Sequence, residues 1–323
     1  MKKLKYFLVL LFVTVSCVEH VITVRIHPDG HYTMQIRSSG DSTDVFDNDF
    51  SHPIPNDIWM KSIQSSVEEN DTIWTMTTQG YLFGFTRFNE DSLSLAPLRY
   101  PVNLIKKEGW ISTRFIFSQI FSGRGAFRKY PILAEALRSN AKLDSIRWMP
   151  EAMEYICTQA IHDIQTTHHF DIETIFLERI RHHLQNYFIH VKKEKLLKEL
   201  DENRDIFLRR AFSPFLTQLP DEFIPAMSQA MKPHEEELRI TMGLQDDSFE
   251  YRVLMPGMMT HTNADTIMND TLKWIFDLET FLNDDVTIEA ESVIFSQTRL
   301  QQLILLLVLS LLIFIGVMWK RSR

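Results

Sequence analysis

The sequence predicts an α+β protein: a mostly antiparallel sheet built from N- and C-terminal strands, a large helical insertion, and one C-terminal transmembrane helix. Three observations predict this fold class. Apolar residues recur with a period of two in residues 17–130 and again in 241–298, they recur with a helical period in residues 131–240, and residues 303–319 are almost continuously apolar. Runs of strands that flank a run of helices are typical of α+β folds.

The N-terminal β-rich part, 17–130, opens with a predicted hairpin. Apolar residues alternate from Val18 to Ile26 and again from Tyr32 to Ile36, with Pro28-Asp29-Gly30 between them. Pro presets one turn dihedral and Gly accepts a positive φ, so this order predicts two paired strands. Residues 38–56 are rich in Asp, Ser, Asn and Pro and are expected to form a loop.

The rest of this part is expected to hold one short helix and three strands. Trp59, Ile63 and Val67 recur every four residues, which predicts a helix with one apolar face. Strands are expected at residues 72–78, 81–88 and 110–121.

The helical insertion, 131–240, is expected to begin helices at Pro131 and Pro150, because the first turn of a helix needs no proline N–H. Two stripes at helical spacing predict one buried face each. The first stripe is Met153, Ile156, Cys157, Ala160 and Ile164, and the second is Ile172, Phe176, Ile180, Leu184, Tyr187 and Val191. Prolines at 214, 220, 225 and 233 are expected to divide the remainder into shorter helices.

The C-terminal β part, 241–298, is expected to contain strands at 249–255, 272–278 and 286–294. The last shows the clearest alternation, with Ile288 and Ala290 on one face and Glu289 and Glu291 on the other. It leads almost directly into the apolar C-terminal stretch. In a single interrupted sheet, the strands next to the two membrane attachments are expected to pair with each other.

Residues 1–16 are predicted to be a signal peptide, because three lysines precede the apolar run from Tyr6 to Val15 and a small residue, Ser16, follows it. The run Val13-Thr14-Val15-Ser16-Cys17 resembles the site at which bacterial lipoproteins are cleaved and acylated, with Thr14 where such sites usually carry Leu, so Cys17 is the candidate lipidation residue. The alternative is ordinary cleavage near Ser16, with Cys17 incidental or a partner for Cys157.

Residues 303–319 predict a transmembrane helix of about 25 Å, which is short but sufficient. Trp319 occupies the position of an interfacial aromatic residue, and Lys320, Arg321 and Arg323 follow. By the positive-inside rule, the tail of residues 320–323 is expected to be cytoplasmic and the body extracytoplasmic.

The charge balance argues against a nucleic-acid partner. Six of the 34 Lys and Arg residues lie at the two ends, which leaves 28 basic against 42 acidic side chains. No stretch interleaves basic and aromatic residues as a nucleic-acid groove would. With only two cysteines, the fold must depend on its apolar core rather than on disulfides.

No catalytic, cofactor-binding or metal-binding residue is predicted. Six histidines at positions 162, 168, 169, 182, 183 and 190 lie close in sequence but lack a metal-ligand spacing, so they are expected to be solvated or boundary residues. Cys157 is expected to act as a small buried hydrophobe. Asp246-Asp247, Asp284-Asp285 and Ser122-Gly123-Arg124-Gly125 are expected to be turns.

The two ends of the chain resemble LppM-type bacterial cell-envelope lipoproteins. The resemblance lies in the segment before Cys17, the strand and Pro-Asp-Gly turn after it, the final apolar stretch and four short C-terminal segments. Those segments are Met255-Pro256-Gly257, Thr262-Asn263-Ala264, Thr271 to Trp274, and Glu289-Ala290-Glu291-Ser292. The resemblance implies a cell-envelope location and binding of an apolar or lipid ligand, and it implies no catalytic residues.

These observations predict a membrane-anchored extracytoplasmic protein of the bacterial inner membrane, non-enzymatic, that binds a lipid or an envelope protein. One alternative is a hydrolase or metal-dependent enzyme whose residues converge only in the folded chain. Another is a eukaryotic single-pass receptor-like protein, in which Asn70 and Asn269 begin glycosylation sequons and Cys17 carries no lipid.

Overall fold

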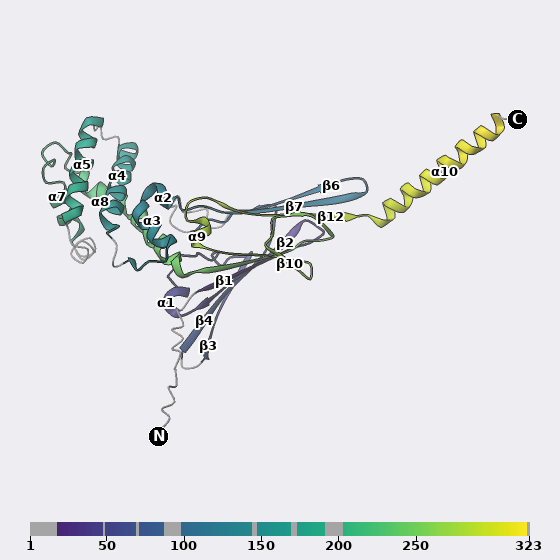
Figure 1. Cartoon of the computed structure of the whole chain (residues 1–323), viewed down its shortest axis with the longest axis horizontal. Coiled ribbons are helices and arrows are strands. Elements are labelled where there is room, and N and C mark those ends of the chain that lie inside the picture. Colours follow the sequence, from purple (N-terminus) through teal and green to yellow (C-terminus); the bar gives the residue numbers. More distant parts are fainter. Residues whose placement is uncertain are drawn as a thin grey trace, which may run out of the picture.

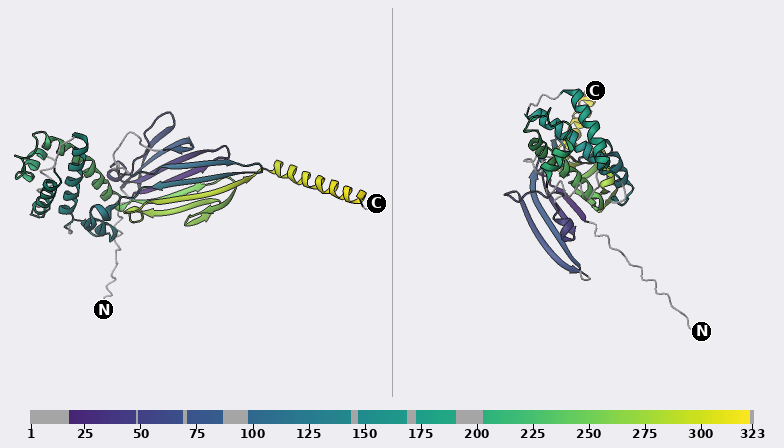
Figure 2. Two further views of the ribbon diagram at one scale, coloured as in Figure 1. Left: turned by 90° about the horizontal axis from the view of Figure 1, so that it is seen from above. Right: turned by 90° about the vertical axis from the view of Figure 1, so that its left-hand side faces the viewer.

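A computed structural model describes residues 18–47, 49–68, 71–86, 98–143, 147–168, 173–190 and 203–321. Two β-sheets form the middle of the molecule, a helical unit lies at one end of the sheets, and a long helix leaves the opposite end (Figure 1). The view from above shows the same order along the long axis (Figure 2). The predicted α+β class and the helical insertion between N- and C-terminal strands are confirmed.

The larger sheet has seven strands in the order β10-β11-β8-β1-β2-β4-β3. The strands are β1 (Glu19–Ile26), β2 (His31–Gly40), β3 (Trp59–Glu68), β4 (Asp71–Phe83), β8 (Ser248–Leu254), β10 (Thr266–Met268) and β11 (Thr271–Asp277). All neighbours are antiparallel except β1 and β8, which pair in parallel across the whole helical insertion.

The smaller sheet has five strands in the order β5-β6-β7-β12-β9. They are β5 (Phe85–Thr86), β6 (Val102–Glu108), β7 (Ser112–Phe121), β9 (Met258–Thr262) and β12 (Val286–Phe295). The expectation of one sheet, in which the strand after Cys17 pairs with the strand before the membrane helix, is wrong. β1 has β2 and β8 on its two edges, whereas β12 has β7 and β9, so neither has an edge free for the other.

The predicted hairpin is confirmed as β1 and β2, paired from Glu19 opposite Ser39 to Ile26 opposite Tyr32. Gly30 has φ 98°, the left-handed conformation for which the turn needs glycine. The Asp29 carboxylate accepts the His31 N–H at 2.9 Å and closes the turn. The loop predicted from residue 38 begins later, because β2 continues to Gly40 and a short helix, α1 (Ser42–Val45), follows.

The helix predicted from Trp59, Ile63 and Val67 is wrong, since these residues lie in β3. β3 is the edge strand of the larger sheet, and Ile63 and Val67 are exposed. Because neither face of this strand is covered over most of its length, its sequence lacks the two-residue alternation that burial of one face imposes. The predicted strands at 72–78 and 110–121 are confirmed as parts of β4 and β7, while β6 was not predicted.

The helical unit contains α2 (Ala126–Lys129), α3 (Pro131–Arg138), α4 (Met149–His168), α5 (Thr174–His190), α7 (Arg204–Ala211) and α8 (Phe223–Gly243). Pro131 and Pro150 lie in the first turns of α3 and α4, as predicted. The first apolar stripe is wholly buried along α4. The expected break at Pro233 is wrong, because α8 continues through it; the packing of α8 against α4 and α7 holds the helix together despite the missing N–H.

Aromatic rings fill the space between the sheets. Phe121 of β7 lies 4.8 Å from the ring of Phe276 in β11, and the rings of Phe249 and Phe276 stack at 5.4 Å. Tyr251 of β8 lies 6.4 Å from Phe117 of β7. These rings belong to one apolar cluster that continues into the helical unit, so the sheets and helices share a core. Two short elements border it, η2 (Leu244–Asp246) and α9 (Leu278–Phe281).

Candidate functional site

The C-terminal helix, α10 (Gln297–Arg321), is long and apolar enough to cross a membrane. It leaves the body at the end of the sheets opposite the helical unit (Figure 1). None of its membrane-length window is buried inside the protein, and Leu305, Leu309 and Ile313 are all more than half exposed. An apolar surface of this extent is stable only against another apolar phase.

The first turn of α10 is tied to the turn between β6 and β7. Ser296 alone separates β12 from α10, and its N–H donates to the Ile111 carbonyl at 2.9 Å. The Arg299 guanidinium donates to the Trp110 carbonyl at 3.0 Å and to the Gly109 carbonyl at 3.4 Å. These contacts hold the helix at the sheets rather than leaving it on a free linker.

The lipidation candidate, Cys17, and the signal peptide of residues 1–16 lie outside the described residues. The next residue, Val18, is buried, and its carbonyl accepts the Ser248 N–H at 3.0 Å. The chain therefore joins the folded body immediately after Cys17, at the end of the sheets that adjoins the helical unit.

A chain of buried polar side chains lies at the same end of the larger sheet. The Ser38 hydroxyl contacts His20 Nδ1 and His52 Nε2, each at 2.7 Å. His20 Nε2 lies 3.1 Å from an Asp247 carboxylate oxygen, and His52 Nδ1 lies 2.9 Å from the Thr78 hydroxyl. The larger sheet supplies His20, Ser38 and Thr78, so three adjacent strands position the network.

Asp247, His20 and Ser38 contain the residue types of a serine hydrolase triad, but the network is closed. Ser38 is 1% exposed, and the ring of His20 is flanked by Phe50 at 4.4 Å and by Phe249 at 4.9 Å. A substrate carbonyl must approach the nucleophilic oxygen to about 3 Å, and the burial of Ser38 leaves no room for that approach. The arrangement therefore satisfies buried polar groups and joins β1 and β2 to the 49–52 segment.

Burial dominates the titration of this network. It lowers the pKa of His20 and of His52 to about 3, and the nearby His20 also lowers the pKa of His52. It raises the pKa of Asp49 and of Asp247, and the negative charge of nearby aspartates, including Asp47, raises both further. Neutral imidazoles and protonated carboxyls are the forms that burial favours.

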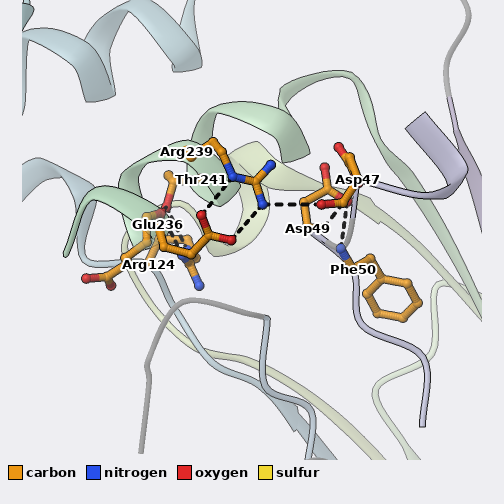
Figure 3. A network of polar contacts seen from close by, with 8 residues as sticks. Asp47, Asp49, Phe50, Arg124, Glu236, Arg239 and Thr241 are labelled. Carbon is orange, nitrogen blue, oxygen red and sulfur yellow. Dashed lines mark hydrogen bonds and ion pairs between the residues drawn. The ribbon is translucent and has the colours of Figure 1, made fainter. Parts of the chain in front are cut away.

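A second polar network joins the helical unit to the sheets (Figure 3). Arg124 is 4% exposed, and its guanidinium donates to the Thr241 hydroxyl at 2.9 Å and to the Glu237 carbonyl at 3.1 Å. The Glu237 carboxylate also pairs with Lys129. The segment predicted as a simple turn at residues 122–125 therefore carries a buried arginine that bonds α8.

On the other side of α8, Arg239 bridges the helix and the segment that follows α1. Its guanidinium pairs with Glu236 at 2.8 Å and donates to the Asp47 carbonyl at 3.2 Å (Figure 3). Asp49 Oδ1 accepts the Phe50 N–H at 2.6 Å in the same segment. Neither network was predicted from the sequence. The one signal for the first network was His20, a polar residue at a position of β1 where the alternation places buried apolar side chains.

The histidines of the helical unit whose side chains the structure describes do not converge. His162, His182 and His190 are exposed, and His183 Nε2 lies 2.9 Å from the Ala211 carbonyl. The side chain of His168 and all of His169 lie outside the described part. Within the described ranges, no group of three or more His, Cys, Asp and Glu residues is arranged to hold a metal ion.

The remaining candidate residues are packed or hydrogen-bonded within the fold. Cys157 is completely buried on α4, and burial raises the pKa of its thiol, which suits a small apolar side chain. Asp285 accepts the Gly123 N–H at 2.7 Å as a loop residue. Asp247 departs from the turn role predicted for it, because it is buried against His20.

Neither a protein-family model nor a curated protein matches the chain. Among solved structures, the chain is similar to the folded domain of the LppM protein of Mycobacterium tuberculosis, determined by NMR. The match has 9% sequence identity and a TM-score of 0.29, and it covers 88% of this chain and 94% of that chain. A TM-score of this size does not establish a common fold.

Proposed function

We propose that this chain is a single-pass protein of the bacterial inner membrane, with α10 in the bilayer, the body outside the cytoplasm and the helical unit presented to a lipid or protein partner. The exposed apolar surface of α10 carries the proposal. The polar residues Gln301 and Gln302 on one flank and the basic tail on the other agree with a cytoplasmic C-terminus. The LppM-type pattern at the chain ends supports an envelope location.

The packing of the body favours a partner that binds at the surface. Rings of β7, β8 and β11 occupy the space between the sheets in the described part of the chain, which leaves that space filled by the protein itself. The helical unit carries a surface hollow of about 440 Å³ against α3. Its lining residues are Pro131, Ile132, Glu135, Ala136 and Ser139. This mostly apolar hollow lies in the unit farthest from α10.

The anchoring part is tested by alkaline carbonate extraction of membranes from cells that express the full chain with Cys17→Ser, so that α10 is the only attachment. We expect the protein to stay in the membrane pellet. Adding Leu307→Arg and Leu311→Arg places two charges in the apolar run, each costing about 3 kcal/mol at a bilayer centre, and is expected to move the protein to the soluble fraction.

The matched control is Gln301→Arg with Gln302→Arg, which adds the same charge on the polar flank of α10 and is expected to remain in the pellet. Release of the parent chain by carbonate, or identical behaviour of the two double variants, contradicts the anchor.

The lipid on Cys17 is a separate proposal, tested on the chain with its native cysteine by the intact mass of the mature protein. A diacylglyceryl group on an N-terminal Cys17 supports this proposal, and an unmodified N-terminus refutes it.

A further inference from the structure

The turn between β6 and β7 reaches the level of the first turn of α10. The bonds from Arg299 to the Trp110 and Gly109 carbonyls, together with the bond from Ser296 to Ile111, fix the two side by side. The hairpin of β6 and β7 extends toward the start of α10 (Figures 1 and 2). The position of the hairpin tip relative to a membrane is therefore set by α10.

The depth of the tip follows from the helix sequence. The apolar run of α10 starts at Leu303, four residues after Arg299, which is about 6 Å along a helix axis. The headgroup layer on each side of the hydrocarbon is roughly 5–8 Å thick. With α10 in a bilayer, the Trp110 backbone lies at the depth of the lipid headgroups.

The side chains at this end of the sheets are large, apolar and exposed, as expected of residues that lie at the depth of the lipid headgroups. Trp110 is 58% exposed, Phe295 at the end of β12 is 48% exposed, and Met258 at the start of β9 is 59% exposed. Met258 pairs with Val293, two residues before Phe295, so these two side chains lie at the same end of the smaller sheet. Tryptophan prefers the boundary between headgroups and hydrocarbon, where its apolar ring and polar N–H are both accommodated.

We propose that the end of the smaller sheet formed by Trp110, Met258 and Phe295 is a membrane contact surface, with the Trp110 indole seated among the lipid headgroups. Its occupant is the bilayer that holds α10 rather than a protein partner, because the Trp110 carbonyl accepts a bond from Arg299 in the first turn of the helix that enters the bilayer. This inference rests on the proposed location of α10. It adds a second membrane contact, at the end of the smaller sheet beside α10.

The test uses the full chain with Cys17→Ser, reconstituted in phosphatidylcholine vesicles that contain doxyl-labelled phosphatidylcholine. A single environment-sensitive fluorophore is attached at Trp110→Cys, and the buried Cys157 stays unlabelled. We expect blue-shifted emission and a loss of fluorescence that is larger with doxyl groups near the headgroup than near the chain ends. Emission as in water, without quenching by either lipid, overturns the proposal.

Two probes provide controls. Ile120→Cys lies on the same hairpin at the far end of β7 and is also partly exposed, at 38%, so it is expected to remain unquenched. Equal quenching at Ile120 and Trp110 contradicts a specific contact at the tip. A probe at Leu309→Cys lies within the apolar run and reports on α10 itself. Quenching at position 309 without quenching at position 110 refutes only the hairpin contact. No quenching at position 309 refutes the anchor.

Discussion

Two aspartates at the junction of the sheets and the helical unit make the stability of this protein depend on pH. In the folded chain the pKa of Asp49 is about 9 and that of Asp247 about 8, because both are buried and lie near other carboxylates. In the unfolded chain an aspartate has a pKa of about 4. The folded state thus holds extra protons above pH 4, and this contribution to stability is lost as pH rises toward these folded-state values.

Histidine titration is confined to lower pH. His20 and His52 have a folded pKa of about 3, so their contribution to stability is lost as pH falls below about 6.5, where unfolded imidazoles take up protons. Between pH 6.5 and 8 the carboxyls therefore dominate. For each carboxyl that stays protonated in the folded state, the free energy of unfolding falls by about 1.4 kcal/mol for each unit of rising pH in this range.

We predict that Asp49→Asn makes the pH dependence of stability between pH 6.5 and 8 clearly shallower, because the amide resembles the protonated carboxyl and does not titrate. The measurement is urea unfolding of the full chain in detergent micelles at several pH values. Asp57→Asn, at an exposed position, is the control and should keep the parent slope. An unchanged slope in Asp49→Asn would show that Asp49 is charged in the folded protein.

At the scale of elements, the link between α8 and the smaller sheet depends on Arg124. We predict that Arg124→Ala destabilises the protein by about 3 kcal/mol, because it leaves the buried Glu237 carbonyl and Thr241 hydroxyl without this donor and removes a positive charge from beside Glu237. Arg128→Ala, on the exposed face of α2, is the matched control and should change stability by less than about 0.5 kcal/mol. Thermal unfolding distinguishes them, and equal melting temperatures for the two variants would refute the role of Arg124.

Elements with one buried face were predictable from the sequence, and elements without one were not. β1, β2 and β12 alternate because one side of each meets the core, and α4 repeats at helical spacing for the same reason. β3 is exposed along most of its length, so nothing in its sequence enforced a period of two. The division into two sheets depends on pairings between distant strands, such as β1 with β8, that local patterns do not encode.

The buried networks were not predictable for a related reason. His20 and Asp247 are 227 residues apart, and only the parallel pairing of β1 with β8 brings them together. A short acidic pair such as Asp246-Asp247 is typical of a turn, and the sequence does not indicate whether the second carboxylate is exposed or buried. Arg124 likewise sits among glycines that indicate a turn, and its burial follows from the packing of α8.

For the whole molecule, the two proposed anchors lie at opposite ends of the sheets. Val18, the first residue of the body, is bonded to Ser248, which follows the helical unit and η2. α10 leaves the end of the sheets opposite the helical unit (Figure 1). The eight residues of β1 span about 26 Å, and the bonded, buried Val18 leaves no linker after Cys17. A lipid on Cys17 and α10 reach the same bilayer only when the sheets lie along the membrane.

This geometry predicts that acylation of Cys17 changes the orientation of the body. On a supported bilayer, neutron reflectivity should find a thinner protein layer for the acylated chain than for Cys17→Ser. In that variant α10 and the end of the smaller sheet are the only membrane contacts, and the rest of the body stands away from the surface. Layers of equal thickness, with acylation verified by mass, would contradict this reconstruction of the two attachments.

Whether α10 spans the bilayer with the body outside the cytoplasm can be measured by adding protease to intact spheroplasts that express the full chain with an epitope after Arg323. We expect the body to be digested while a short C-terminal fragment that contains α10 and the epitope is protected. A body that resists protease until the membrane is permeabilised, or an epitope that is removed from outside, would contradict the account.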